Sequence, residues 1–140
     1  MMKNILVPVD GSEGGWKALS VAKELAEKFQ AKVTVVTVVQ VFAGASIMPI
    51  PVESGKINAE LQNIANTVLD GAKEHLGGVE AELVSAPGRP SKVIVNTAKE
   101  RKADLVVIGS RGLSGIAEFF LGSVSSEVAQ LSPCSVLIVK

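Results

Sequence analysis

The apolar residues of this chain follow two patterns along the sequence. Short runs of Val, Ile and Leu alternate with longer segments in which an apolar residue recurs every three or four positions. The short runs are typical of strands that are buried on both faces, and the longer segments are typical of helices with one buried face. We therefore expect strands at residues 3–9, 32–39, 80–85, 104–108 and 135–139.

The segment after the first strand predicts a helix with a capped start. Ser12 is placed as its N-cap, and Glu13 in the first turn favours the positive end of the helix dipole. The expected core face repeats at helical spacing and consists of Ala18, Ala22, Leu25 and Phe29. This helix should pack against the sheet through small and aliphatic side chains.

A longer helix is expected after Ser54, which is placed to cap it. Gly77 and Gly78 end this helix, because glycine readily adopts the left-handed conformation that is common after a helix. Its expected core positions again share helical spacing and are Ile57, Leu61, Ile64, Val68, Ala72 and Leu76.

Two further helices, at about residues 90–101 and 122–131, complete an alternation of strands and helices. Strands joined by single helical crossovers form a parallel sheet with right-handed connections. We therefore predict the α/β class, with an open five-stranded parallel sheet and helices on both faces. A chain of 140 residues has the size of one domain, so we expect a single domain spanning residues 1–140.

Composition narrows the classes of function. Fourteen basic and fourteen acidic residues give a formal net charge of zero, so there is no excess of positive charge for a nucleic acid or an anionic membrane. No apolar run reaches the roughly 20 residues that a membrane span needs. A single cysteine, Cys134, excludes an internal disulfide, and the first residues carry no signal-peptide pattern. We expect a cytoplasmic protein without nucleic-acid or membrane partners.

The stretch from 105 to 125 carries the strongest chemical signal. Its apolar run ends at Gly109, and Gly112 follows after two residues. Glycine has no Cβ and accepts positive φ, so the backbone N–H groups around it can approach an anion closely. Residues 122–125 begin the last helical segment, and the N–H groups and dipole of a helix start also favour negative charge. Isolated glycines more often only make a tight turn, but two such groups in one stretch indicate an anion site.

Asp10 is expected at the carboxyl-terminal tip of the first strand, the edge where open α/β sheets bind ligands. Taken alone, it is as readily interpreted as a turn former or a helix cap. Gly11, Gly14 and Gly15 nearby lack the G-x-G-x-x-G spacing, and the chain has no G-x-x-x-x-G-K-[ST]. Neither a dinucleotide-binding fingerprint nor a P-loop is therefore indicated.

Several parts of the sequence together resemble one known family. They are ILVPVDGSE at 5–13, PGRPSKVIV at 87–95, DLVVIGSRG at 104–112, the pattern Gly109-x2-Gly112-x9-Gly122-Ser123, and CSVLIVK at 134–140. Along its whole length the chain resembles the universal stress protein family, and the glycine pattern is similar to the nucleotide-binding signature of its ATP-binding members. Many members carry a histidine just before the final Pro-Cys pair, where this chain has Gln130, Leu131 and Ser132.

The resemblance implies the strand order 3-2-1-4-5, in a Rossmann-like fold of the adenine nucleotide alpha hydrolase-like type. It also implies an ATP site where the first and fourth strands lie side by side, with any Mg²⁺ held mainly by the phosphates. The place of Val38 in the adenine pocket rests on the resemblance alone, because its chemistry fits ordinary strand core equally well. The implied site residues are Pro8, Val9, Asp10, Val38, Ile108, Gly109, Ser110, Arg111, Gly112, Gly122, Ser123, Val124 and Ser125.

These observations favour an ATP-binding universal stress protein, a nucleotide-responsive regulatory or stress-survival module. Two alternatives stay open: a slow ATP hydrolase or phosphotransferase, and a nucleotide-independent dimeric scaffold. The glycine stretch contains Arg111 and several serines but no paired carboxylates and no lysine. It therefore lacks most of the groups that usually catalyse phosphoryl transfer. We therefore predict no dedicated catalytic residues and no protein metal ligands. A homodimer is expected through Ser135–Val139, an apolar edge strand, as the resemblance also implies.

Four other features of the sequence, one apolar segment and three single residues, are not assigned to the nucleotide site. The apolar segment at 40–51 covers a ligand, forms a dimer contact or is disordered, and the sequence does not choose among these. His75 is expected to interact with the dipole at the end of its helix, since no second histidine exists to share a metal. Arg89 is expected as a charge in a surface loop, and Cys134 as a buried structural thiol.

Overall fold

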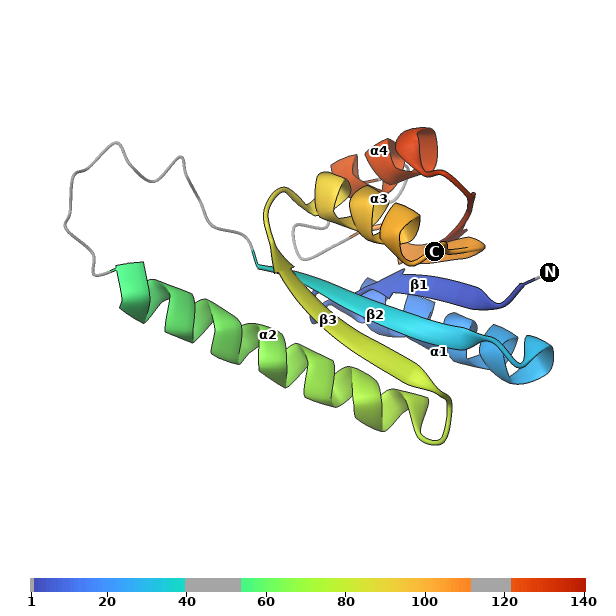
Figure 1. The fold of residues 1–140 in the computed structure, drawn as a ribbon, viewed down its shortest axis with the longest axis horizontal. Helices are drawn as coiled ribbons and strands as arrows, with labels where there is room; N and C mark the ends of the chain where they lie inside the picture. Colours follow the sequence, from blue (N-terminus) through green and yellow to red (C-terminus); the bar gives the residue numbers. More distant parts are fainter. Residues whose placement is uncertain (1, 40–53, 112–121) are drawn as a thin grey trace.

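The computed structural model describes residues 2–39, 54–111 and 122–140. Strands and helices alternate along the chain, as the sequence patterns predict (Figure 1). The elements are β1 (Asn4–Pro8), α1 (Glu13–Phe29), β2 (Lys32–Val39), α2 (Ser54–Leu76), β3 (Ala81–Pro87), α3 (Pro90–Glu100), β4 (Leu105–Gly109), α4 (Ser123–Leu131) and β5 (Ser135–Val139). The expected segment at 40–51 and residue Gly112 lie outside the described residues.

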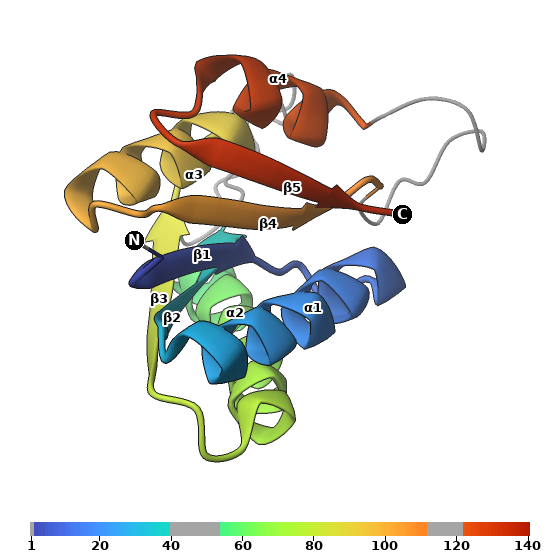
Figure 2. The same cartoon turned by 90° about the vertical axis from the view of Figure 1, so that its right-hand side faces the viewer.

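The five strands form one parallel sheet in the order β3-β2-β1-β4-β5 (Figure 2). This confirms both the predicted fold class and the strand order that the family resemblance implies. β1 lies between β2 and β4, with Val7 opposite Val35 and Leu6 opposite Val106. The chain therefore reverses its direction of strand addition between β1 and β4, which is the place where open α/β sheets bind ligands.

Helices cover both faces of this sheet. α1 and α2 lie against one face, and α3 and α4 lie against the other (Figures 1 and 2). Successive strand residues point to opposite faces, so Ile5 and Val7 join the core under α1 and α2, while Leu6 joins the core under α3 and α4. The continuous apolar runs of the sequence are thus explained by burial on both sides.

α1 begins with the predicted cap. The N–H of Gly15 donates to Oγ of Ser12 over 3.3 Å, which satisfies one N–H of the first turn. The expected core face is correct in its first half, but Phe29 is 56% exposed and does not belong to it. The residues of α1 that are buried are Gly15, Ala18, Leu19, Ala22 and Ala26.

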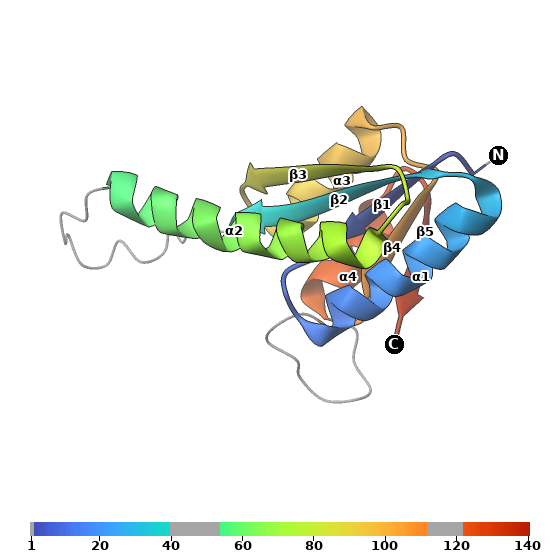
Figure 3. The ribbon, with the colours of Figure 1, turned by 90° about the horizontal axis from the view of Figure 1, so that it is seen from below.

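α2 differs from its expected orientation. Ser54 is the first helical residue rather than a cap preceding the helix, and Ile64 is 62% exposed although the spacing placed it in the core. Among its described side chains, the predicted core residues Ala72 and Leu76 are buried, together with Ala65 and Leu69, which were not predicted. Gly77 ends the helix with a positive φ of 57°, as predicted. The first turns of α2 project beyond the sheet (Figures 1 and 3).

The amino-terminal end of the sheet is closed by polar contacts. The carboxylate of Asp104 accepts hydrogen bonds from the backbone N–H groups of Lys3 and Asn4, over 2.8 and 2.9 Å. Glu82 on β3 forms ion pairs with Lys32 and Arg101. Among the described helices, none is long and apolar enough to span a bilayer.

Candidate functional site

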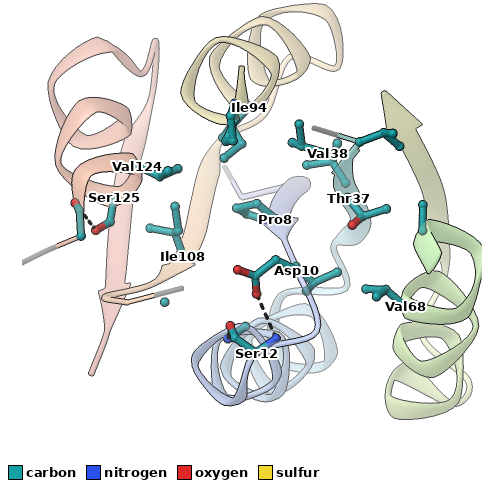
Figure 4. A pocket seen from close by; sticks show the side chains of 18 of the residues that line it. Pro8, Asp10, Ser12, Thr37, Val38, Val68, Ile94, Ile108, Val124 and Ser125 are labelled. Atoms are coloured by element: carbon teal, nitrogen blue, oxygen red, sulfur yellow. Dashed lines mark hydrogen bonds between the residues drawn. The ribbon is translucent and has the colours of Figure 1, made fainter. Parts of the chain in front are cut away.

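A cavity of about 510 Å³ opens at the carboxyl-terminal ends of β1, β2 and β4 (Figure 4). It lies at the point where strand order reverses, and the start of α4 forms part of its wall. Most of the residues that the sequence analysis singled out meet here: Pro8, Val9, Asp10, Val38, Ile108, Gly109, Arg111, Gly122, Ser123, Val124 and Ser125. Of the other two, Ser110 is beside the cavity without lining it, and Gly112 is not described.

Asp10 is held at the floor of the cavity by the turn between β1 and α1. Its Oδ1 accepts the N–H of Ser12 over 2.9 Å, which is an Asx turn. Gly11 has a φ of +87°, a value that side-chain-bearing residues rarely adopt, so glycine is needed for the chain to leave β1 at this angle. Figure 4 shows the Asp10 carboxylate projecting between Ile108 on β4 and Val38 on β2.

The start of α4 supplies backbone donors to the opposite wall. The first hydrogen bond within the helix runs from the N–H of Ser126 to the carbonyl of Gly122, over 3.0 Å. The N–H groups of Ser123, Val124 and Ser125 therefore precede the intrahelical ladder and have no acceptor within the helix. All three residues line the cavity, and the dipole of α4 adds partial positive charge at the same place.

Two amides expected to bind an anion are already engaged within the protein. The N–H of Gly122 donates to the carbonyl of Ser110 over 2.8 Å, and the N–H of Ser110 donates to the carbonyl of Val139 over 2.9 Å. The hydroxyl of buried Ser125 also lies 3.1 Å from the carbonyl oxygen of Ser110. These contacts fasten α4 to the end of β4, and the first turn of the helix retains candidate donors; the amide of Gly112 lies outside the described residues.

The two described glycines of the motif, Gly109 and Gly122, serve close approach rather than unusual backbone angles. Gly122 has a φ of −60°, and Gly109 is not among the described glycines with positive φ. A Cβ on Gly109 would lie 2.7 Å from the carbonyl oxygen of Gly14, which real Cβ atoms essentially never do. A Cβ on Gly122 would lie 3.3 Å from the carbonyl oxygen of Ser110. Of the two reasons for glycine given by the sequence, only the missing Cβ applies at these positions.

An apolar wall, which the sequence analysis missed apart from Val38, completes the cavity. It comes from three elements and consists of Val36 and Val39 on β2, Leu61, Ile64, Ala65 and Val68 on α2, and Pro90 and Ile94 on α3. Ser12, Gly15 and Thr37 also line the cavity. Ile64 is exposed because it faces this space rather than the sheet. The available signal was a surplus of apolar residues on α2, which carries a second apolar stripe beside the one that packs on the core.

An ion-pair cluster joins the start of α3 to α4. Glu127 on α4 accepts hydrogen bonds from the hydroxyl of Ser91 over 2.6 Å and from the guanidinium of Arg89 over 2.7 Å. The hydrogen bond from Ser91, followed by the positive charge of Arg89, lowers the pKa of Glu127 from its ordinary value. Arg89 is the exposed charge expected from sequence, and its negative partner lies within the second turn of α4.

Two other candidate residues lie outside the cavity. His75 stacks on Trp16 with the ring centroids 5.0 Å apart, and its Nδ1 is 3.1 Å from the carbonyl oxygen of Gly71. Cys134 is half-buried against the core under α3 and α4, with its Sγ 3.5 Å from Oγ of Ser132. In the part of the chain that the structure describes, no three His, Cys, Asp or Glu side chains are grouped to hold a metal ion.

Comparison with known proteins gives a consistent result over the whole chain. The model of the universal stress protein family matches residues 1–140. The universal stress protein YxiE of Bacillus subtilis (strain 168) is 40% identical over 148 residues, covering 100% of both chains.

Two solved structures share the fold. That of the universal stress protein UspA from Lactobacillus plantarum has a TM-score of 0.85 and 26% identity, covering 99% of this chain and 97% of that one. That of a universal stress protein in complex with cAMP has a TM-score of 0.76 and 28% identity, again covering 99% and 97%. By the family match and by its identity to a full-length relative, this chain belongs to the universal stress protein family.

Proposed function

We propose that this protein binds ATP in the cavity at the carboxyl-terminal end of the sheet and acts as a nucleotide-responsive regulatory or stress-survival module. One observation carries the proposal. The ends of β1, β2 and β4 and the start of α4 are distant in sequence, yet their implied site residues line one cavity of about 510 Å³. If the glycines only made tight turns, there would be no reason for a cavity beside them with a helix N-terminus in its wall.

The phosphates are assigned to the start of α4. Three N–H groups at Ser123, Val124 and Ser125, together with the helix dipole, favour an anion there. Arg111 also lines the cavity and adds a full positive charge. The fixed contacts from Gly122 and Ser125 to Ser110 hold this turn in place before any ligand binds, so little ordering is needed on binding.

The base and ribose are assigned to the other side of the cavity. The apolar wall of β2 and α2, including Val38, offers a surface for a flat aromatic base, which gains from leaving water. Asp10 lies between the two sides and is placed to accept a hydrogen bond from a ribose hydroxyl or an adenine amino group. The solved structure of a universal stress protein in complex with cAMP supports an adenine nucleotide as the ligand.

The proposal is tested by identifying what the protein carries and what it binds. Protein purified without added nucleotide is denatured, and the released small molecules are identified by mass spectrometry. Calorimetry with ATP, cAMP and GTP, with and without Mg²⁺, then ranks the ligands. We expect ATP to bind more tightly than cAMP, because only the triphosphate can carry several negative charges to the start of α4. If no nucleotide is released and none binds, the proposal fails and a nucleotide-independent scaffold is favoured.

We also propose that turnover of bound ATP is slow or absent. The described lining residues offer one carboxylate, Asp10, and phosphoryl transfer usually needs metal-binding carboxylates and a positioned nucleophile. A phosphate-release assay with Mg²⁺ measures this directly. Turnover of about 1 per second or faster, within the ordinary range of enzymes, would favour the hydrolase or phosphotransferase instead.

A homodimer through β5 is part of the same proposal. β5 ends one edge of the sheet, and its Leu137 is 39% exposed. The other edge, β3, carries Glu82 in ion pairs, and charge on an edge strand discourages further pairing. Analytical ultracentrifugation should therefore show a dimer that Leu137→Lys disrupts. Phe29→Lys, an exposed apolar residue at the end of α1, is the matched control and should leave the dimer intact.

A further inference from the structure

We infer that Gly14, in the first turn of α1, is a positioning residue that sets how the phosphate side of the site lies relative to the ribose side. The inference rests on the proposed function and goes beyond it. Gly14 does not line the cavity itself. It packs behind the cavity wall, between the turn that carries Asp10 and the end of β4.

The backbones of α1 and β4 meet at this glycine without any side chain between them. A Cβ on Gly14 would lie 2.6 Å from the carbonyl oxygen of Arg111 and 4.0 Å from Cα of Gly109. Reciprocally, a Cβ on Gly109 would lie 2.7 Å from the carbonyl oxygen of Gly14. The two segments are in backbone contact, as in Cα–H···O contacts between closely packed elements. Neither position therefore has room for a side chain.

A methyl group at position 14 cannot be accommodated by a side-chain rotation, because the atom it meets is a backbone carbonyl. One of the two segments has to shift. The start of α1 is anchored by the Ser12 cap and by buried Gly15 and Ala18. The end of β4 leads directly to Arg111, which is exposed. We expect the segment from Gly109 to Arg111 to move, together with the start of α4, which is hydrogen-bonded to Ser110.

Such a movement changes one side of the cavity and leaves the other unchanged. Gly109 and Arg111 line the cavity beside the start of α4, where the phosphates are assigned, and Ser110 is hydrogen-bonded to Gly122. The apolar wall is formed by β2, α2 and α3, and no residue of these elements is among the three nearest contacts of a Cβ on Gly14. Gly14→Ala should therefore weaken binding of the triphosphate and not of the nucleoside.

Gly78 provides a control that also gains one methyl group. It lies between α2 and β3, at the other end of the sheet, and it does not line the cavity. A Cβ on Gly78 would meet nothing within 4 Å. Gly78→Ala should therefore leave the positions of both cavity sides unchanged.

The experiment uses backbone amide NMR spectra of the full chain and of both variants, first without ligand and then titrated with ATP and with adenosine. In Gly14→Ala we expect the free-protein resonances of Gly109, Ser110 and Arg111 to move more than in Gly78→Ala. We expect ATP affinity to fall at least about tenfold, which is about 1.4 kcal/mol, and adenosine affinity to change by less than about twofold. In Gly78→Ala both affinities should stay within about twofold of the parent.

Each other outcome contradicts the inference in a distinguishable way. If the resonances at 109–111 do not move in the free Gly14→Ala protein, the contact does not position that segment. If ATP and adenosine affinities fall together, the substitution acts through general destabilisation. If the parent itself binds no ATP, the proposed function fails and the inference fails with it.

Discussion

Two aspartates at opposite ends of β1 show how the same side chain serves different purposes in this fold. Asp104, at the amino-terminal end of the sheet, accepts hydrogen bonds from the backbone N–H groups of Lys3 and Asn4. Asp10, at the carboxyl-terminal end, accepts the N–H of Ser12 and borders the cavity. The contact of Asp10 is local, those of Asp104 join the two ends of distant segments, and both residues are exposed. Asp10 lines the cavity at the switch point of the sheet, and Asp104 lines neither of the two cavities found among the described residues.

The difference extends to the two ends of the sheet as a whole. Ion pairs of Glu82 and the hydrogen bonds of Asp104 tie β1, β2 and β3 to neighbouring segments at the amino-terminal end. At the carboxyl-terminal end, the strands stop around a cavity with a helix start in its wall. We therefore expect substitutions at the first end to change stability, and substitutions at the second to change nucleotide binding.

The largest expected effect comes from Gly122→Val at the start of α4. A Cβ here already lies 3.3 Å from the carbonyl oxygen of Ser110, and the branched side chain would fill the space beside the first-turn N–H groups. We expect ATP affinity to fall at least about 100-fold, or about 2.7 kcal/mol, with the fold retained by circular dichroism.

A matched glycine at the other end of the sheet tests whether this effect is local. A Cβ on Gly78 would meet nothing within 4 Å, and no positive φ constrains it. Gly78→Val should leave ATP affinity within about twofold of the parent in the same calorimetric titration. Equal losses in the two variants would show that the carboxyl-terminal cavity is not the binding site.

Asp10→Ala is the next most severe change. One hydrogen bond to the nucleotide is removed, so we expect ATP affinity to fall by about 1 kcal/mol, and by up to about 3 if the carboxylate is charged in the contact. The unfolding free energy should fall by about 1 kcal/mol from the loss of the acceptor of the Ser12 N–H. Calorimetry and urea denaturation measure the two effects separately, and a loss of stability without a loss of affinity would assign Asp10 to the turn alone.

Asp104→Ala should lower stability and leave ATP affinity unchanged. Two exposed backbone hydrogen bonds are lost, which lowers the unfolding free energy by about 1–2 kcal/mol. ATP affinity should not change, because Asp104 does not line the cavity. Urea denaturation at pH 7 beside the ATP titration gives both numbers. A fall in affinity as large as that of Asp10→Ala would contradict the division between the two ends.

The smallest expected effect is the dependence of stability on pH. The hydrogen bond from Lys3, followed by that from Asn4, lowers the pKa of Asp104 from its ordinary value of 3.8. The unfolded chain then binds the proton more readily, so this contribution is present above about pH 4 and is lost as pH falls through the lowered pKa. Glu127, whose pKa is also lowered, adds an effect of the same sign. Denaturation curves from pH 7 to pH 3 should lose stability less steeply in Asp104→Asn than in the parent.

Much of this architecture is predictable from sequence because the strands and helix ends depend on local patterns. The bounds of β2 and β5 match, Ser12 caps α1, and Gly77 ends α2. The orientation of helices is less predictable, because neighbouring apolar stripes on one helix compete for the core. The spacing predicts Phe29 and Ile64 in the core, but in the folded chain the smaller residues Ala26 and Ala65 are buried there.

The candidate site also has a part that is predictable from sequence and a part that is not. The motif residues around Asp10, Gly109 and Gly122 were identified from spacing and family resemblance, and the structure places them around one cavity. The apolar wall from α2 was not predicted, because it depends on how that helix rotates over β2. The contact of Gly14 with Arg111 was not predicted either, since it joins segments that only the folded chain brings together.

The central claim is that ATP binds at the carboxyl-terminal end of the sheet with its phosphates at the start of α4. Amide NMR spectra of the parent protein during an ATP titration test it most directly. The account predicts that the largest shifts occur at Ser123, Val124 and Ser125, while the amides of Lys3 and Asn4, which are bonded to Asp104, stay in place. Shifts centred on the amino-terminal end, or no shifts at saturating ATP, would contradict it.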